Sequence, residues 1–532
     1  MFLISGAVVL AFLLVGVLFV DATSNAASAT MDFIARYFGW FYILVATFFL
    51  VFVIGLAISR FGKLRLGPDD SRPEFSTVAW FAMLFTAGMG IGLVFFGVYE
   101  APYHAANPPV GQAPAADQGM NWTFFHWGLH PWAIYTVLGL AMGYFCFRKG
   151  LPLRPASALY PLLGSRIYGW PGNLIDILAV FGTLFGLATS LGLGTQQINT
   201  GLNELFGLPN NLTSQVLIVA VITGVAVTSV MFGIDKGIRR LSVLNMWLAL
   251  LLMVFVFAVG PKLYMLTGLA DWTGNYLSSI VGNSFTVFNP NTAPEAASWQ
   301  AGWTLFYWGW WISWAPFVGM FVARISRGRT VREFVTGVLG APVAASIVWF
   351  SILGGTGLYY ETVLGTVDIS GQDPELALFS LMQALPIGAI LSVLVSVLAI
   401  LVVTLFFATS SDSGSLVVDM LTNGGDPHPI WQQRFFWAVL EGAVTAVLLV
   451  VGGAAALDSL QSAAVTTGLP FAVVLLLVAI GTVKGMQNDR FPIPAADRAG
   501  SERSGVSGYS PAERKDDEES ETAEKTTATV GD

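Results

Sequence analysis

Residues 87–92 read AGMGIG and place three glycines at every second position within the apolar stretch 77–98. The length of that stretch is typical of a membrane-spanning helix, because a bilayer core of about 30 Å takes about 20 apolar residues. Glycines inside such a helix free backbone groups, which are tolerated only where protein or a water-filled cavity satisfies them. The stretch therefore predicts a broken membrane helix beside a cavity, with close packing through small residues as the alternative.

A second stretch, WGWWISWAP at 308–316, lies within the apolar residues 299–323 and carries a glycine and a proline. If spans three to seven and eight to twelve form two five-helix halves, each break falls on the first helix of its half. Matched breaks are typical of secondary transporters built from inverted repeats, whose binding site lies at the bilayer midplane. We therefore expect two inverted five-helix repeats, preceded by two extra helices.

Apolar stretches of similar length recur along most of the chain. Of its 532 residues, 55% are hydrophobic and 11% are charged, whereas about a quarter are charged in an ordinary soluble domain. This composition excludes a soluble enzyme and predicts an all-α membrane protein without enzymatic activity. The twelve expected spans are 2–20, 37–58, 77–98, 122–147, 173–200, 213–233, 241–261, 299–323, 334–358, 387–421, 433–454 and 465–485.

These spans divide the chain into five segments. Two helices and a loop occupy 1–76, the first repeat 77–270, an extracellular loop 271–298 and the second repeat 299–485. The remaining segment, 486–532, is rich in acidic residues and poor in apolar ones, a composition that predicts a disordered tail.

Basic residues indicate the orientation, because Lys and Arg are enriched in short cytoplasmic loops. They gather after spans two, four, six and eight and in the tail. This pattern predicts a multi-pass protein of the cell membrane with both termini in the cytoplasm. The net charge of −8 argues against nucleic-acid binding, and the single cysteine, Cys146, excludes a cysteine-rich metal site.

Aromatic residues crowd two of the spans. Trp308, Trp311 and Trp314 recur at every third position and should face roughly one way, while span four carries Trp127, Trp132 and Tyr135. A cluster of aromatic faces attracts a cation that has no N–H to donate, because the ring quadrupole needs no hydrogen bond. Quaternary ammonium is the ligand that fits this chemistry, and aromatic core packing is the alternative.

Span ten carries a polar run, ATSSDS at 408–413. Hydroxyl and carbonyl oxygens suit a small alkali cation, and a polar run in hydrocarbon is costly unless it serves a site. We expect Thr409 and Ser410 to be ion ligands, although such hydroxyls can also bond to the carbonyl four residues earlier. Asp412 is expected to brace the helix.

His126 and His130 have the spacing of two metal ligands on one helix face. No Glu or Cys in the sequence pattern completes a metal site with them. Hydrogen bonding within the helix bundle is therefore the expected role of both.

Four stretches together resemble the betaine/carnitine/choline transporter family. They are AGMGIGLVFFGVYEAP (87–102), HWGLHPWAIY (126–135), FYWGWWISWAPFVGMFVARISRGRTVREF (306–334) and ATSSDS (408–413). The resemblance implies twelve transmembrane helices and the inverted-repeat fold shared with amino-acid/sodium symporters. It also implies homotrimers and sodium-coupled uptake of trimethylammonium compounds by alternating access.

The resemblance also implies roles for individual residues. The substrate would bind Trp127, Trp132, Tyr135 and Trp311, with Trp314 beside its carboxylate and Trp310 lining the inward path. Sodium is the coupling ion, and no other cofactor is implied. Its ligands would be backbone oxygens of Thr86, Met89 and Phe406 and the hydroxyls of Thr409 and Ser410.

Gly92 bears on substrate choice. Relatives similar to choline carriers have Asp at this position of the glycine motif, whereas this chain has Gly92. The glycine favours a zwitterion such as glycine betaine. A proton-coupled choline carrier and a sodium-independent carnitine-type exchanger are the alternatives within the same family.

Overall fold

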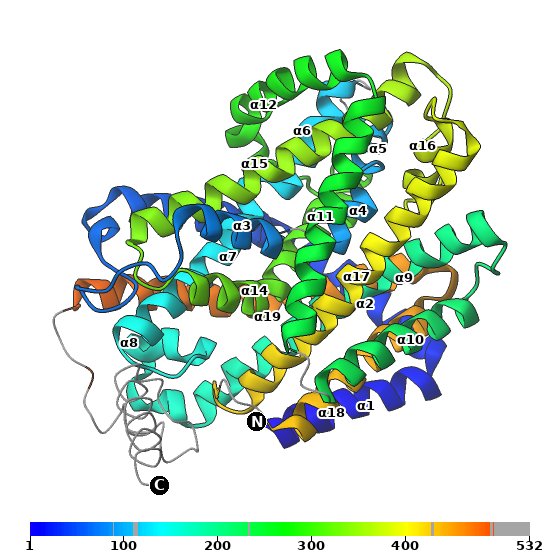
Figure 1. Cartoon of the computed structure of the whole chain (residues 1–532). Helices are drawn as coiled ribbons and strands as arrows, with labels where there is room; N and C mark the ends of the chain where they lie inside the picture. Colours follow the sequence, from blue (N-terminus) through cyan, green and yellow to red (C-terminus); the bar gives the residue numbers. More distant parts are fainter. Residues whose placement is uncertain (89, 110–114, 232–234, 427–429, 490–492, 494–532) are drawn as a thin grey trace, which may run out of the picture.

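The chain is helical in the part that its computed structural model describes, which is residues 1–88, 90–109, 115–231, 235–426, 430–489 and 493 (Figure 1). Those residues form no β-sheet; an isolated bridge joins Arg65 to Thr330. The all-α prediction is therefore confirmed. The α-helices are α1 (Phe2–Leu18), α2 (Val20–Ile58), α3 (Thr77–Gly88), α4 (Ile91–Phe96), α5 (Glu100–Ala106), α6 (Ala116–Trp127), α7 (Leu129–Met142), α8 (Tyr160–Leu163), α9 (Trp170–Phe206), α10 (Leu212–Met231), α11 (Asp235–Val259), α12 (Lys262–Ser284), α13 (Pro294–Gln300), α14 (Phe306–Ile325), α15 (Val331–Leu358), α16 (Ala377–Ala384), α17 (Gly388–Thr422), α18 (Trp431–Gly452) and α19 (Ala456–Gln487).

Short helical segments extend or connect these helices. Three are π-helical and add a wider turn to the helix beside them, namely η2 (Gly143–Arg148), η5 (Ala301–Leu305) and η6 (Tyr359–Val363). The others are 3₁₀-helical turns, namely η1 (Arg60–Lys63), η3 (Pro155–Leu159), η4 (Gly164–Tyr168) and η7 (Gly453–Ala455).

Every predicted span contains helix, but the number that cross a membrane stays a prediction. Within the described residues, six helical stretches are long and apolar enough to cross a bilayer: Val20–Ile58, Trp170–Phe206, Leu241–Val259, Val331–Val363, Gly388–Thr422 and Trp431–Gln487. The arrangement as two inverted repeats likewise stays a prediction. The acidic tail lies almost wholly outside the described residues, apart from the end of α19 and residues 488, 489 and 493.

The predicted break at the AGMGIG motif is present. Helix α3 ends at Gly88 and α4 begins at Ile91, and Gly90 between them has an extended backbone with φ −142° and ψ −176°. Met89 lies outside the described residues. The interruption lies within the run of three glycines. Glycine has no Cβ and leaves the helical conformation more easily than other residues, so a break is expected here, as the sequence indicated.

The predicted break at WGWWISWAP is wrong, because α14 runs unbroken through it with Pro316 inside. A Cβ at Gly309 would lie 2.7 Å from the Cα of Val465, and one at Gly468 would lie 2.7 Å from the carbonyl oxygen of Gly309. The small residues therefore let α14 pack closely against α19, which is the alternative that the pattern left open. The two helices cross near the centre of the molecule, beside α7 (Figure 1).

A break that the sequence analysis missed divides the fourth span into α6 and α7. Gly128 separates them with φ −96° and ψ −127°. The backbone N–H of Leu129, which the break leaves without a helical partner, donates to the Tyr276 hydroxyl at 2.9 Å. Tyr276 belongs to α12, a helix over residues that the sequence analysis assigned to no span. The tertiary contact thus satisfies the backbone that Gly128 frees.

Several loops meet at one face of the helix bundle. The bridge between Arg65 and Thr330 joins the loop after α2 to the loop after α14. Arg148, at the end of η2, bonds to Asp69 at 2.7 Å and to Asp489, just after α19, at 2.6 Å. Burial opposes ionisation of Asp489, but hydrogen bonds from Arg148, Tyr144 and Lys149 outweigh it and hold the pKa of Asp489 below its usual range. The loops after α2 and α14 and the C-terminal ends of η2 and α19 therefore lie on one side of the molecule, as the basic-residue pattern predicts. Which side faces the cytoplasm stays a prediction.

Candidate functional site

A cavity lies beside the break between α3 and α4. The empty space in the cavity and at its mouth, open solvent included, is about 440 Å³, and none of the residues described around it carries a charge. Six of them are aromatic and come from α6, α7 and α14; we call this set the aromatic box. The box consists of Trp127, Trp132, Tyr135, Trp310, Trp311 and Trp314, and the other lining residues are Gly90, Gly92, Leu93, Pro131, Ser190 and Ser346.

The rings of the aromatic box meet at distances typical of favourable aromatic pairs. Trp310 and Trp311 stack with centroids 4.6 Å apart, and Trp127 meets Trp311 edge-on at 5.0 Å. Tyr135 approaches Trp132 at 5.5 Å and Trp311 at 6.3 Å. Thus the structure brings every aromatic residue that the sequence analysis proposed for substrate binding to one cavity; what they bind stays a prediction.

Hydrogen bonds fix the orientation of three box rings. The indole N–H of Trp310 donates to the Gly186 carbonyl at 3.1 Å, and that of Trp311 donates to the His126 carbonyl at 3.1 Å. The indole N–H of Trp127 donates to a carboxylate oxygen of Glu100 at 2.7 Å. Because these donors are used outside the cavity, the three residues offer it ring surface.

Two polar atoms of the box have no hydrogen-bond partner in the described part of the protein. They are the indole N–H of Trp314 and the hydroxyl of Tyr135, and both are buried. A buried donor without a partner costs free energy, and in a native structure it calls for an explanation such as a bound water, an ion or a functional role. Both atoms suit a carboxylate.

The expectation that Trp308 shares a face with Trp311 and Trp314 is wrong. Trp308 is fully buried away from the cavity and stacks on His130, with ring centroids 5.4 Å apart. Three residues advance an α-helix by about 300° rather than a full turn, so a row of residues at this spacing drifts around the helix. Trp310, four residues before Trp314, lies on the cavity side instead.

Gly92 leaves room for the box. A Cβ at this position would lie 2.6 Å from the Trp310 ring and 2.8 Å from the Trp127 ring. Cβ atoms in proteins essentially never come this close to another heavy atom. At Gly90 the nearest atom, in the Trp314 ring, would be 3.6 Å away, an ordinary contact. Any side chain at position 92 must therefore displace two walls of the cavity.

Glu100 is a residue of the site that the sequence analysis missed. Its carboxylate is fully buried and accepts hydrogen bonds from the Trp127 indole at 2.7 Å and the Tyr307 hydroxyl at 2.5 Å. His126 Nδ1 lies 2.8 Å from the other oxygen. The available signal was a lone Glu directly after an apolar span, with a His four residues later; its partners on α6 and α14 follow only from the tertiary structure.

The predicted sodium ligands lie in α3 and α17, with Met89 outside the described residues and the Thr86 side chain among those that the structure does not describe. The Thr409 hydroxyl donates to the Leu405 carbonyl at 2.8 Å and lies 3.3 Å from the Phe406 carbonyl. Ser410 is half-buried. The Thr409 hydroxyl therefore makes the local bond that the sequence analysis named as the alternative, and sodium binding stays a prediction.

Two other polar residues have structural partners. Asp412 accepts a hydrogen bond from Arg434 of α18 at 3.0 Å and so braces α17, as expected. His130 Nε2 lies 3.0 Å from the Ser284 hydroxyl. His126 instead contacts the Glu100 carboxylate. The sequence pattern alone did not connect this carboxylate with His126.

Comparisons with known proteins give consistent matches along the chain. The family model for betaine/carnitine/choline family transporters matches residues 1–491. A glycine betaine transporter of Acinetobacter baylyi is 43% identical over 494 residues, which cover 92% of this chain and 73% of that protein. A glycine betaine/proline/choline/ectoine transporter of Vibrio parahaemolyticus is 44% identical over 489 residues, which cover 90% of this chain and 85% of that protein.

The comparison with solved structures gives matches at low sequence identity, of which we report one. It is a sodium-coupled sialic acid symporter in a substrate-bound outward-open state, with a TM-score of 0.45 and 12% identity. The match covers 85% of this chain and 86% of that chain.

Proposed function

This chain belongs to the betaine/carnitine/choline transporter family, and on that premise we propose that it imports glycine betaine or a related compatible solute together with sodium by alternating access. In this proposal the protein is a homotrimer in the cell membrane with both termini in the cytoplasm. Osmoprotection is the physiological role that such uptake serves.

The aromatic box is the observation that carries the proposal. Its rings present negative π faces to the cavity, and none of the described lining residues carries a charged side chain. Three of its indole N–H groups already donate to groups outside the cavity. A trimethylammonium group carries a positive charge and has no N–H to donate, so it suits such a surface. A cation with several N–H donors would find only the hydroxyls of Tyr135, Ser190 and Ser346 as acceptors among the described lining side chains, and each donor left unpaired has a cost.

The two unpartnered donors favour a zwitterion over a bare cation. The Trp314 indole N–H and the Tyr135 hydroxyl can donate to a carboxylate, which glycine betaine has and choline lacks. No carboxylate lines the described cavity to balance the charge of choline. A relative in Vibrio parahaemolyticus is named for glycine betaine, proline, choline and ectoine together, so the proposal includes related solutes beside glycine betaine.

Sodium coupling would supply the free energy for accumulation. Glycine betaine is net neutral, so the membrane potential acts through the ion alone. One sodium ion gains about 2.3 kcal/mol at 100 mV, and a tenfold sodium gradient adds about 1.4 kcal/mol. One ion per solute would sustain roughly a few-hundred-fold accumulation.

Uptake of labelled glycine betaine into a transport-deficient cell tests the proposal. We expect saturable uptake in sodium medium and loss of most of it when potassium replaces sodium. Parallel assays with labelled choline and carnitine separate the rivals: choline uptake driven by acid medium indicates the proton-coupled carrier, and sodium-independent exchange indicates the carnitine type. Equal uptake of glycine betaine in both media would reject sodium coupling.

Replacing Trp311 tests the box. Trp311→Ala should weaken glycine betaine binding about 30-fold or more, because a desolvated cation–π contact contributes about 2 kcal/mol or more. Trp311→Phe should be milder. Trp308→Phe is a matched control on the same helix, outside the cavity, and should bind like the parent in isothermal titration. Parent-like binding by Trp311→Ala would show that the box is misplaced.

The double variant Thr409→Ala/Ser410→Ala tests the ion site. It removes two hydroxyls and little volume, so the sodium concentration for half-maximal uptake should rise at least about tenfold while expression stays intact. Thr404→Ala is the control, since the Thr404 hydroxyl makes the same bond to a carbonyl four residues earlier. An unchanged sodium dependence in the double variant contradicts the assignment.

Variants at position 92 test substrate choice. Gly92→Asp and its neutral isostere Gly92→Asn should both lower glycine betaine uptake, because either Cβ overlaps two box rings. Only Gly92→Asp should gain choline uptake, since a carboxylate in a cavity of low dielectric attracts the cation and repels the carboxylate of betaine. If neither variant gains choline uptake, Gly92 serves packing alone.

A further inference from the structure

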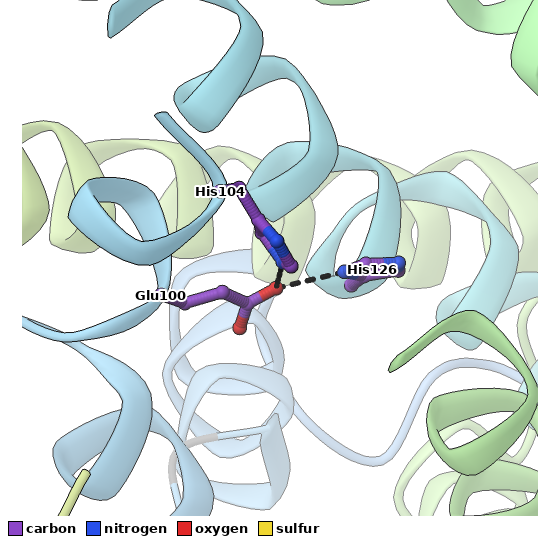
Figure 2. A group of neighbouring side chains, drawn as sticks. All are labelled: Glu100, His104 and His126. Atoms are coloured by element: carbon purple, nitrogen blue, oxygen red, sulfur yellow. Dashed lines mark hydrogen bonds and ion pairs between the residues drawn. The ribbon is translucent and has the colours of Figure 1, made fainter. Parts of the chain in front are cut away.

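A second polar group lies behind the aromatic box. Glu100 and His104 are one turn apart on α5, and His126 approaches them from α6 (Figure 2). All three side chains are fully buried. The two imidazoles converge on the same carboxylate oxygen, Oε1 of Glu100, as Figure 2 shows.

The distances within this group fit the donor atoms of a metal site. His126 Nδ1 lies 2.8 Å and His104 Nε2 lies 3.3 Å from Glu100 Oε1, and the three ligand atoms lie within 4.8 Å of one another. Ligands about 2.0–2.2 Å from one tetrahedral ion lie about 3.3 Å apart. His104 Nε2 is already at this separation from Oε1, whereas His126 Nδ1 would have to move slightly farther from Oε1 for both to bind a single ion.

The two carboxylate oxygens of Glu100 have different partners. Oε2 accepts the hydrogen bonds of Trp127 and Tyr307, so it belongs to the wall of the box. Oε1 faces the two imidazoles. An ion on Oε1 would therefore leave both hydrogen bonds of the box in place.

His104 has one partnered and one unpartnered nitrogen in its buried position. Its Nε2 lies 3.3 Å from Oε1 of Glu100, an ion-pair contact, and its Nδ1 has no hydrogen-bond partner in the described structure. The rings of Trp303 and Trp299 cover it at centroid distances of 4.4 and 5.2 Å. A fully buried imidazole that is enclosed by aromatic rings and directed at a carboxylate has surroundings that suit a metal ligand.

The neighbour of His126 suits a metal-ligating histidine. Its Nε2 lies 3.0 Å from the Thr304 hydroxyl, which can donate to a bare nitrogen or accept from a protonated one. Ligating histidines usually bond through their second nitrogen to such an oxygen, which fixes the tautomer. If an ion binds Nδ1, the imidazole can carry its proton on Nε2 instead. Nε2–H then donates to the Thr304 hydroxyl, so this contact persists.

We propose that Glu100, His104 and His126 form a binding site for a divalent transition metal, with Zn²⁺ as the best fit, separate from the proposed substrate and sodium sites. Two neutral imidazoles and one carboxylate are a donor set that Zn²⁺ takes readily, and hard cations such as Mg²⁺ prefer oxygen. The ion would join α5 to α6 directly behind Trp127.

Metal binding to purified, tag-free protein in detergent tests the site. After treatment with a chelator, we expect one Zn²⁺ per chain by isothermal titration and a rise in the melting temperature, because an ion that binds only the folded protein stabilises it. His104→Gln and His126→Gln should each weaken binding at least about 100-fold. The histidines are chosen because a change at Glu100 would also release Trp127.

Two control variants keep the result specific. His130→Gln changes another buried histidine on α7, and His428→Gln changes the remaining histidine of the chain; both should bind Zn²⁺ like the parent. If the histidine variants fold poorly, Co²⁺ added to the parent gives an independent measurement, since tetrahedral Co²⁺ absorbs visible light strongly. A parent chain that binds no Zn²⁺, binding that survives in His104→Gln, or the weak spectrum of six-coordinate Co²⁺ would overturn the proposal.

Discussion

Polar groups buried between the helices of this membrane protein need partners inside the protein, because hydrocarbon offers none. Glu100 is a clear example, since its carboxylate is fully buried and has several partners. His126 and Trp127 of α6 and Tyr307 of α14 bond to it, which fixes Trp127 and Tyr307 relative to α5. The same requirement explains why Tyr276 of α12 lies against the break at Gly128. Among the buried polar atoms without a partner in the described structure, the Tyr135 hydroxyl and the Trp314 indole N–H belong to residues that line the cavity.

Close approach of helix backbones is the second constraint on the cavity. Gly309 and Gly468 let α14 pack against α19, and a Cβ at Gly182 would lie 2.9 Å from the Ser313 carbonyl oxygen, so α9 also approaches α14 closely. These contacts set the depth and rotation of α14. Its rotation then decides that Trp310, Trp311 and Trp314 reach the cavity while Trp308 packs on His130.

The two glycine-containing motifs show how far local patterns predict structure. Both free the helix backbone in principle, yet the first interrupts its helix at Gly90 and the second does not. The sequence around Gly309 offers the same local signal, but the surface of α19 fills the space beside it. Whether a glycine breaks a helix or receives a neighbour depends on what lies opposite, which a single stretch of sequence does not contain.

The sequence by itself determined the all-helical membrane class, the break at the AGMGIG motif, the residues that meet in the aromatic box and the family. Those features depend on composition, on spacing along one helix and on motifs that are read locally. Three features became clear only from the tertiary structure. Helix α14 is continuous, Trp308 packs on His130 outside the aromatic box, and Glu100 lies next to His104 and His126. The reason is physical: His126 is 26 residues from Glu100, and Tyr307 is 207. Contacts at such separations are set by the rotation and depth of packed helices, which depend on all of their neighbours at once.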